Sequence, residues 1–146
     1  MSRRLPLVPN WVRWLIVGCV AAVILIVSVL RPGSASRITG PLGVFGIDKY
    51  LHVLAYGGLA TVLAYALAEW EPRRAGVAVF VLAVAFGFVV ELVQLPLAYR
   101  QFSRLDLLAN AVGASVIAAS WGVVAARLRF ERITAEATGF PSDGDP

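Results

Sequence analysis

Long apolar stretches separated by short polar segments dominate this chain of 146 residues. A helix needs about 20 apolar residues to cross the hydrocarbon core of a bilayer. Four stretches reach this length, and Pro32, Pro72 and Pro96 lie near their junctions. The pattern therefore predicts an all-α polytopic membrane protein, a bundle of four transmembrane helices over residues 11–30, 49–68, 75–97 and 105–126.

The overall composition strengthens this prediction. Hydrophobic residues make up 59% of the chain and the mean hydropathy is +0.77, which is too apolar for a domain with a hydrated surface. The net charge of +4 comes from Arg residues at segment ends, with no basic run interleaved with aromatics. Nucleic acid is therefore not an expected partner. The single cysteine, Cys19, excludes an intramolecular disulfide, and no cofactor is expected.

The positions of the basic residues predict the orientation in the membrane. Eight lie near the amino terminus, in the segment between the second and third stretches or after the fourth stretch, against five on the opposite side. The positive-inside rule places the larger group in the cytoplasm. Residues 1–10 and 127–146 are then cytoplasmic, with residues 134–146 expected to be disordered. All four tryptophans fall near the same, inner boundary: Trp11, Trp14, Trp70 and Trp121.

The first apolar stretch allows two other interpretations. Residues 2–4 resemble a twin-arginine export signal followed by a cleavage site at residues 34–36, and residues 16–19 resemble a lipoprotein signal ending at Cys19. Both signals use a shorter apolar core than the one present here. We therefore expect an uncleaved helix in which Cys19 faces lipid or packs against a neighbour.

Polar residues gather at one end of the other three predicted helices. Residues three or four apart share a helix face, so the polar positions form one stripe on each helix. The predicted topology places all three stripes at the outer side of the membrane. The stripes are Asp48, His52 and Tyr56; Glu91 and Gln94; and Asp106, Asn110 and Gly113.

Glu91 is expected to lie roughly 9 Å inside the membrane boundary, because six residues follow it before the predicted end of the helix at Leu97. A carboxylate at that depth needs a proton or a cationic partner. The basic residues on the same side are Lys49, the only lysine of the chain, Arg100 and Arg104. Arg100 suits a bidentate contact with a carboxylate or a phosphate.

The polar positions divide into candidates for chemistry and candidates for binding. His52, Glu91 and Asp106 could supply acid or base catalysis. The same ionisable groups could instead form an ion network that fastens helix ends. Gln94 and Asn110 could be interhelical links. Ser103 could serve as the cap of the last helix and have no other role. With a single histidine and no spacing motif, no metal site is expected. Candidate binding residues are Asp48, Lys49, Tyr56, Gln94, Arg100, Ser103, Arg104 and Asn110.

The segments DKYLHVLAY and ELVQ, and the R-x-x-S-x-x-D-x-x-x-N run from Arg100 to Asn110, resemble the VanZ-like family in order and spacing over about residues 48–119. The resemblance implies a small polytopic envelope protein, similar to one that gives low-level resistance to the glycopeptide teicoplanin. It also implies that the family's characteristic positions lie at Asp48, Lys49, His52, Tyr56, Glu91, Gln94, Arg100, Ser103, Asp106 and Asn110.

The leading functional expectation is a pocket that binds or modifies an anionic envelope lipid or a lipid-linked cell-wall intermediate. In this interpretation Lys49 and Arg100 hold phosphate, and Arg104 assists at the rim. Two alternatives stay open: a small proton-coupled or drug transporter, and a non-enzymatic membrane scaffold in which the polar residues only form an ion network.

Overall fold

The computed structural model describes residues 3–30, 40–41, 43, 46–98 and 102–132. The predicted disordered tail at residues 134–146 lies outside this part. The described elements are four helices, as predicted, and two short strands that were not predicted. In chain order they are β1 (Arg3–Leu7), α1 (Asn10–Leu30), α2 (Ile47–Ala66), α3 (Pro72–Gln94), α4 (Arg104–Arg127) and β2 (Leu128–Arg132).

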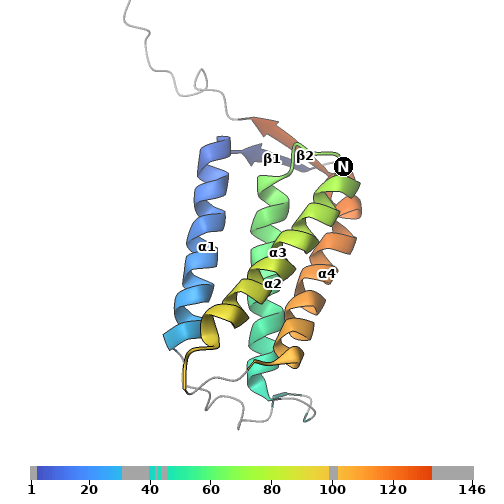
Figure 1. Cartoon of the computed structure of the whole chain (residues 1–146). Coiled ribbons are helices and arrows are strands. Elements are labelled where there is room, and N and C mark those ends of the chain that lie inside the picture. The colour runs from blue at the N-terminus through green and yellow to red at the C-terminus, as the bar shows by residue number, and fades with distance from the viewer. Residues whose placement is uncertain (1–2, 31–39, 42, 44–45, 99–101, 133–146) are drawn as a thin grey trace, which may run out of the picture.

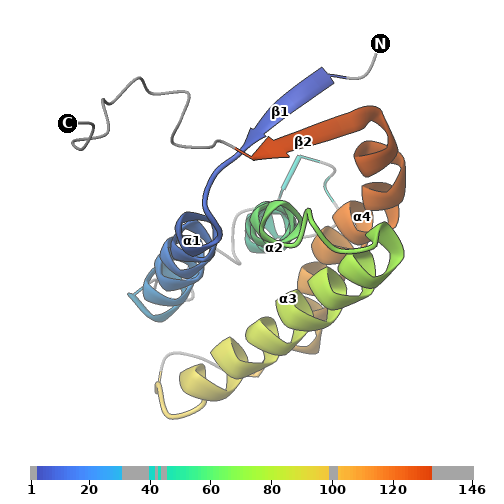
Figure 2. The same ribbon diagram turned by 90° about the horizontal axis from the view of Figure 1, so that it is seen from above.

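The four helices run alternately up and down, so α1 and α3 begin at the end where α2 and α4 finish (Figure 1). Seen along the bundle, α2 lies in the middle (Figure 2), and it contacts α1, α3 and α4. The helix that carries the first polar stripe is therefore the one most enclosed by the others.

Three helices, α1, α3 and α4, are long and apolar enough to cross a membrane. Large apolar side chains on all three are exposed, with Val23 60%, Val81 55% and Val116 61% accessible. Soluble monomers rarely expose apolar surface so widely. The central helix α2 does not reach the same apolar composition, because Asp48, Lys49 and His52 occupy its first two turns.

Small residues allow α2 and α4 to pack closely. A Cβ atom added at Gly113 would overlap the carbonyl oxygen of Val53 and lie 3.0 Å from the Gly57 backbone nitrogen. Close approach at such small residues is typical of helix pairs in membranes. From this contact toward the end of the bundle where α3 begins, the core is apolar. Its nearly inaccessible residues include Tyr56, Leu59, Ala60, Val79, Ala83 and Ala114.

The expected end of α3 was three residues too late. The helix finishes at Gln94 instead of Leu97, because Pro96 has no backbone N–H to continue the hydrogen-bond ladder. The Leu95 and Leu97 amides instead make short-range bonds, to Leu92 at 3.3 Å and to Gln94 at 3.0 Å. Glu91 consequently lies about 4.5 Å from the helix end along the axis, half the distance expected from an end at Leu97.

The two strands form a parallel ladder in which Arg3 pairs with Leu128 and Leu7 with Arg132. The ladder lies across the end of the bundle where α1 begins and α4 finishes (Figures 1 and 2). Side chains of α2 and α4 join it to the helices. The Tyr65 hydroxyl donates to the Pro6 carbonyl at 2.9 Å and accepts from the Val8 amide at 3.2 Å. The Phe130 ring packs against Trp121, with centroids 6.0 Å apart.

A buried arginine fixes the beginning of α1 to the end of α2. Arg13 is only 3% exposed, donates to the Ala66 carbonyl at 3.0 Å and pairs with Glu69 at 2.5 Å. The last carbonyls of a helix have no partner within that helix, so Arg13 satisfies one of them. In the sequence, Arg13 was one of the eight basic residues that predict the orientation, and this structural role was missed.

We expect Tyr65→Phe to loosen β1, because the Val8 amide loses its acceptor and the Pro6 carbonyl loses its donor. One lost hydrogen bond is worth about 1 kcal/mol, which corresponds to roughly fivefold faster hydrogen exchange at the Val8 amide. Exchange mass spectrometry on residues 3–8 measures this. Tyr50→Phe is the matched control, since the buried Tyr50 hydroxyl has no hydrogen-bond partner in the described part of the chain. Equal exchange in both variants contradicts the assigned role of Tyr65.

Candidate functional site

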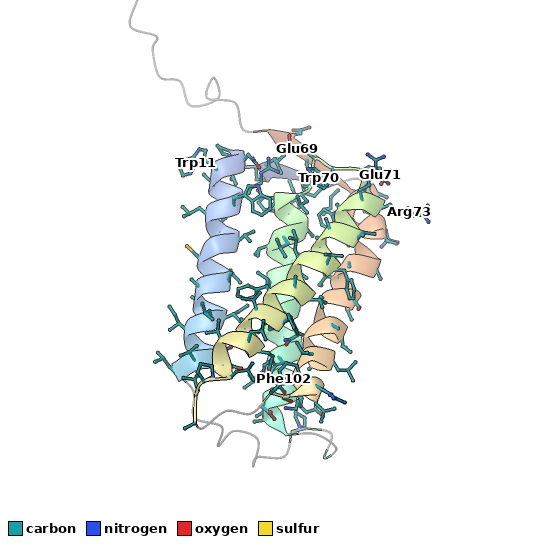
Figure 3. All side chains as sticks on the ribbon, in the orientation of Figure 1. Trp11, Glu69, Trp70, Glu71, Arg73 and Phe102 are labelled. Atoms are coloured by element: carbon teal, nitrogen blue, oxygen red, sulfur yellow. The ribbon has the colours of Figure 1, made fainter. Side chains whose placement is uncertain are left out.

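Polar side chains from three helices meet at the end of the bundle where α2 and α4 begin and α3 finishes. Figure 3 marks this end by Phe102 and the opposite end by Trp11, Glu69, Trp70, Glu71 and Arg73. The geometry thus joins the three stripes that the sequence pattern predicts on separate helices. We call the following residues the polar cluster: Asp48, Lys49, His52, Glu91, Asp106 and Asn110.

Lys49 forms the centre of the charge pattern. Its ammonium group contacts Asp48 Oδ2 at 2.6 Å and also pairs with Asp106 Oδ1. The side chains of Lys49 and Asp48 are each 19% exposed and that of Asp106 is 10% exposed. One cation therefore lies between two carboxylates, and these three residues carry a net charge of −1. Lys49 consequently has its charge matched within the protein.

His52 is held in a defined orientation by Asn110. Its Nδ1 lies 2.9 Å from Asn110 Oδ1, and because an amide oxygen can only accept, Nδ1 carries the proton. Its Nε2 lies 3.7 Å from Asp106 Oδ2, which is too long for a hydrogen bond. The ring also stacks on Tyr56, with centroids 6.3 Å apart and planes inclined by 12°. In the neutral ring, Nε2 therefore presents its lone pair beside a carboxylate.

Ser103 caps α4, as the S-x-x-D spacing predicts. Its hydroxyl accepts from the Asp106 amide at 3.2 Å. In a complete capping box the third helical residue would in turn accept the amide of the capping serine. Here Asp106 points to Lys49 instead, and Glu91 Oε2 of α3 accepts the Ser103 amide at 3.1 Å. Glu91, only 3% exposed, thereby ties the end of α3 to the start of α4.

Gln94 makes its hydrogen bond away from this centre. Gln94 donates to the Ser28 carbonyl of α1 at 2.8 Å, which is the interhelical link considered as an alternative to ligand binding. Arg104 is exposed at the start of α4, which suits a rim position. Arg100 lies outside the described residues.

Gly87 is a site residue that sequence reasoning missed. A Cβ atom here would lie 2.7 Å from Asn110 Nδ2 and 3.0 Å from the Tyr56 ring, so only glycine leaves room for the group that orients His52. A signal was present in the sequence, because Gly87 lies four residues before Glu91 and therefore on the same face of α3.

A metal ion has no complete donor set in the described part of the chain, where no group of three His, Cys, Asp or Glu side chains is arranged to hold one. The space between Asp48 and Asp106, where a cation would be attracted, holds the Lys49 ammonium group. The described geometry therefore offers acid, base and hydrogen-bonding groups.

Comparison with known protein families, curated proteins and solved structures found no match to this chain.

Proposed function

We propose that this protein is a multi-pass plasma-membrane protein with four spans, both termini cytoplasmic and the polar cluster at the outer face. The cluster engages the anionic headgroup of an envelope lipid or lipid-linked cell-wall intermediate, in keeping with the VanZ-like resemblance of residues 48–119. The fourth span is α2. Its polar residues are compatible with insertion because Lys49 and His52 face α4 and are paired there with Asp106 and Asn110. The outward face of α2, which includes Leu51 and Leu54, is exposed and apolar.

The observation that carries the proposal is the orientation of His52. Asn110 fixes the ring, Nε2 has no donor in the described part of the chain, and the side chain is 19% exposed. A histidine held in this way can accept a proton from a hydroxyl or phosphate group brought to it. The cluster lies at the bundle end, where lipid headgroups would meet it, and not sealed in the core.

The roles of the basic residues follow from their partners. Because Lys49 is paired with Asp48 and Asp106, we assign it to positioning Asp106 beside His52. The phosphate contact then falls to Arg100, with the exposed Arg104 at the rim. An arginine fork matches the geometry of a phosphate.

The transporter alternative has less support from the described residues. A transported ion or drug needs a route from the cluster to the opposite end of the bundle. The residues that follow the cluster inward are Tyr56 and then small and aliphatic side chains, all nearly inaccessible. The scaffold alternative accounts for the ion pairs, including the one between Asp106 and a protonated His52, but it assigns no ligand to the His52 side chain, which is 19% exposed.

Native mass spectrometry of the detergent-purified protein tests the proposal. We expect one co-purified phospholipid or isoprenoid phosphate per chain that is lost at least tenfold in Arg100→Ala, since a charge-assisted contact is worth about 1.5–3 kcal/mol. Arg127→Ala, which removes an exposed arginine at the opposite end, is the matched control and retains the lipid. Persistence of every bound lipid in Arg100→Ala contradicts the proposal.

Glu91→Gln separates binding from folding. A glutamine oxygen can still accept the hydrogen bond from the Ser103 amide, so we expect the variant to fold and insert. Glutamine supplies no acid or base group, so we expect the envelope phenotype of the protein to be lost. A folded Glu91→Gln protein with the parental phenotype would favour the scaffold.

A further inference from the structure

A groove with polar and apolar parts lies between α3 and α4, at the end of the bundle opposite the polar cluster. Its volume is about 580 Å³, within the range of small-molecule binding sites. Polar residues lie at one end of it, and apolar or small residues line the remainder. The lining residues are Glu71, Pro72, Arg73, Gly76, Val77, Phe80, Ala118, Ala119 and Gly122.

The groove exists because its floor is made of residues with little or no side chain. A Cβ atom at Gly76 would lie 2.8 Å from the Ala118 carbonyl oxygen, so the two helices nearly touch there. At Gly122, by contrast, an added Cβ atom meets nothing within 4 Å. A substitution at Gly122 therefore enters the groove without disturbing the core.

The charges at the mouth leave a cation available. Both carboxylate oxygens of Glu71 accept backbone amides, from Arg73 at 3.0 Å and from Arg74 at 2.9 Å. These amides hold the pKa of the Glu71 carboxyl below its usual value, so its negative charge stays on the α3 terminus. The Arg73 side chain is exposed, and its charge and that of Arg74 also lower the Glu71 pKa, so two arginines and one carboxylate leave a net charge of +1 at this terminus.

The polar and apolar parts of the groove are separated along the membrane normal. From Glu71 to Phe80 the helix advances about 13 Å, which is the distance from the headgroup region into the acyl chains of one leaflet. The exposed Trp70 beside Glu71 (Figure 3) is of a residue type that favours the headgroup level.

We propose that this groove binds an anionic phospholipid of the cytoplasmic leaflet, with the phosphate at Arg73 and one acyl chain along Val77, Phe80 and Ala119. The leaflet assignment rests on the orientation proposed above. The site is distinct from the polar cluster, because Gly122 and Asp106 are about 24 Å apart along α4.

Titration of delipidated protein with dioleoyl phosphatidylglycerol or dioleoyl phosphatidylcholine, followed by native mass spectrometry, tests this site. The parent binds phosphatidylglycerol more tightly than phosphatidylcholine. Gly122→Leu fills the groove and weakens phosphatidylglycerol binding about tenfold. Gly18→Leu, at another open glycine on α1, is the matched control and leaves binding unchanged. Equal binding by Gly122→Leu and Gly18→Leu overturns the proposal.

Arg73→Gln tests the headgroup contact. We expect about tenfold weaker binding of phosphatidylglycerol, from loss of one charge-assisted contact, and unchanged binding of phosphatidylcholine. Arg127→Gln, which removes an equal charge at the same end, has no such effect. Equal affinity of the parent for the two lipids overturns the headgroup assignment.

Two further outcomes are decisive. If the parent is a dimer that Gly122→Leu dissociates, the groove holds a second copy of the chain and the lipid proposal is wrong. If Arg100→Ala leaves all bound lipid in place while Gly122→Leu removes one, the function proposed for the polar cluster fails and the groove stands. The melting temperature of each variant is measured in the same detergent, and only variants that melt at the same temperature as the parent are compared.

Discussion

Gly113→Ala is expected to lower the free energy of unfolding by about 2–3 kcal/mol, at the upper end of the range for overpacked cores. The added methyl group would overlap the Val53 carbonyl oxygen and crowd the Gly57 nitrogen at 3.0 Å. Both are backbone atoms of α2 and cannot rotate away, so α2 and α4 must separate. Equilibrium unfolding in mixed dodecyl maltoside and SDS micelles measures the change.

Gly122→Ala is the matched control on the same helix, because its new methyl group meets nothing within 4 Å. We expect a change of less than about 1 kcal/mol, and in the stabilising direction, since alanine favours the helix over glycine. Equal stability of Gly113→Ala and Gly122→Ala would show that the α2–α4 contact is looser than described.

The second large effect concerns Lys49→Met, which removes the cation between two carboxylates. Breaking a buried ion pair costs about 3–5 kcal/mol, and partial exposure of this group reduces the expected loss to about 2–3 kcal/mol. The side chains of Asp48 and Asp106 then face each other with no cation between them. The same micellar unfolding assay gives the value.

A double variant shows whether the loss comes from charge. Lys49→Met with Asp106→Asn removes one carboxylate and keeps the backbone amide that Ser103 caps, so we expect it to recover at least half of the lost stability. Arg104→Met is the control for removing a cation at the same end, and exposed charges of this kind contribute less than about 1 kcal/mol. A loss in Arg104→Met as large as in Lys49→Met would exclude a specific ion cluster.

The sequence pattern was sufficient for elements whose signals are local. Apolar runs of about 20 residues located each helix to within three residues of its observed ends. The spacing of polar positions predicted which faces turn inward, as the burial of Glu91, Asp106 and Asn110 confirms. The capping role of Ser103, considered as an alternative to ligand binding, was recognisable because the S-x-x-D signal lies within four residues.

Features that depend on contacts between distant segments were not predictable in this way. The alternation of apolar and polar residues in a five-residue strand is too short a signal to predict a strand. It is also too short to predict pairing with a second strand that follows four helices later in the chain. The buried role of Arg13 needs Ala66 and Glu69 beside it, and the need for glycine at position 87 depends on Asn110 and Tyr56. Likewise, the pairing of Lys49 with two carboxylates follows from the packing of α2 against α4.

The parallel ladder also bears on how the protein is made. Arg3 of β1 is synthesised 125 positions before its partner Leu128, a wait of roughly 6–25 s at ordinary rates of translation. During that time β1 has no strand to pair with, because β2 is the other strand of this two-stranded sheet. Because β2 follows α4 in the chain, the ladder that closes this end of the bundle can form only after all four helices have been synthesised.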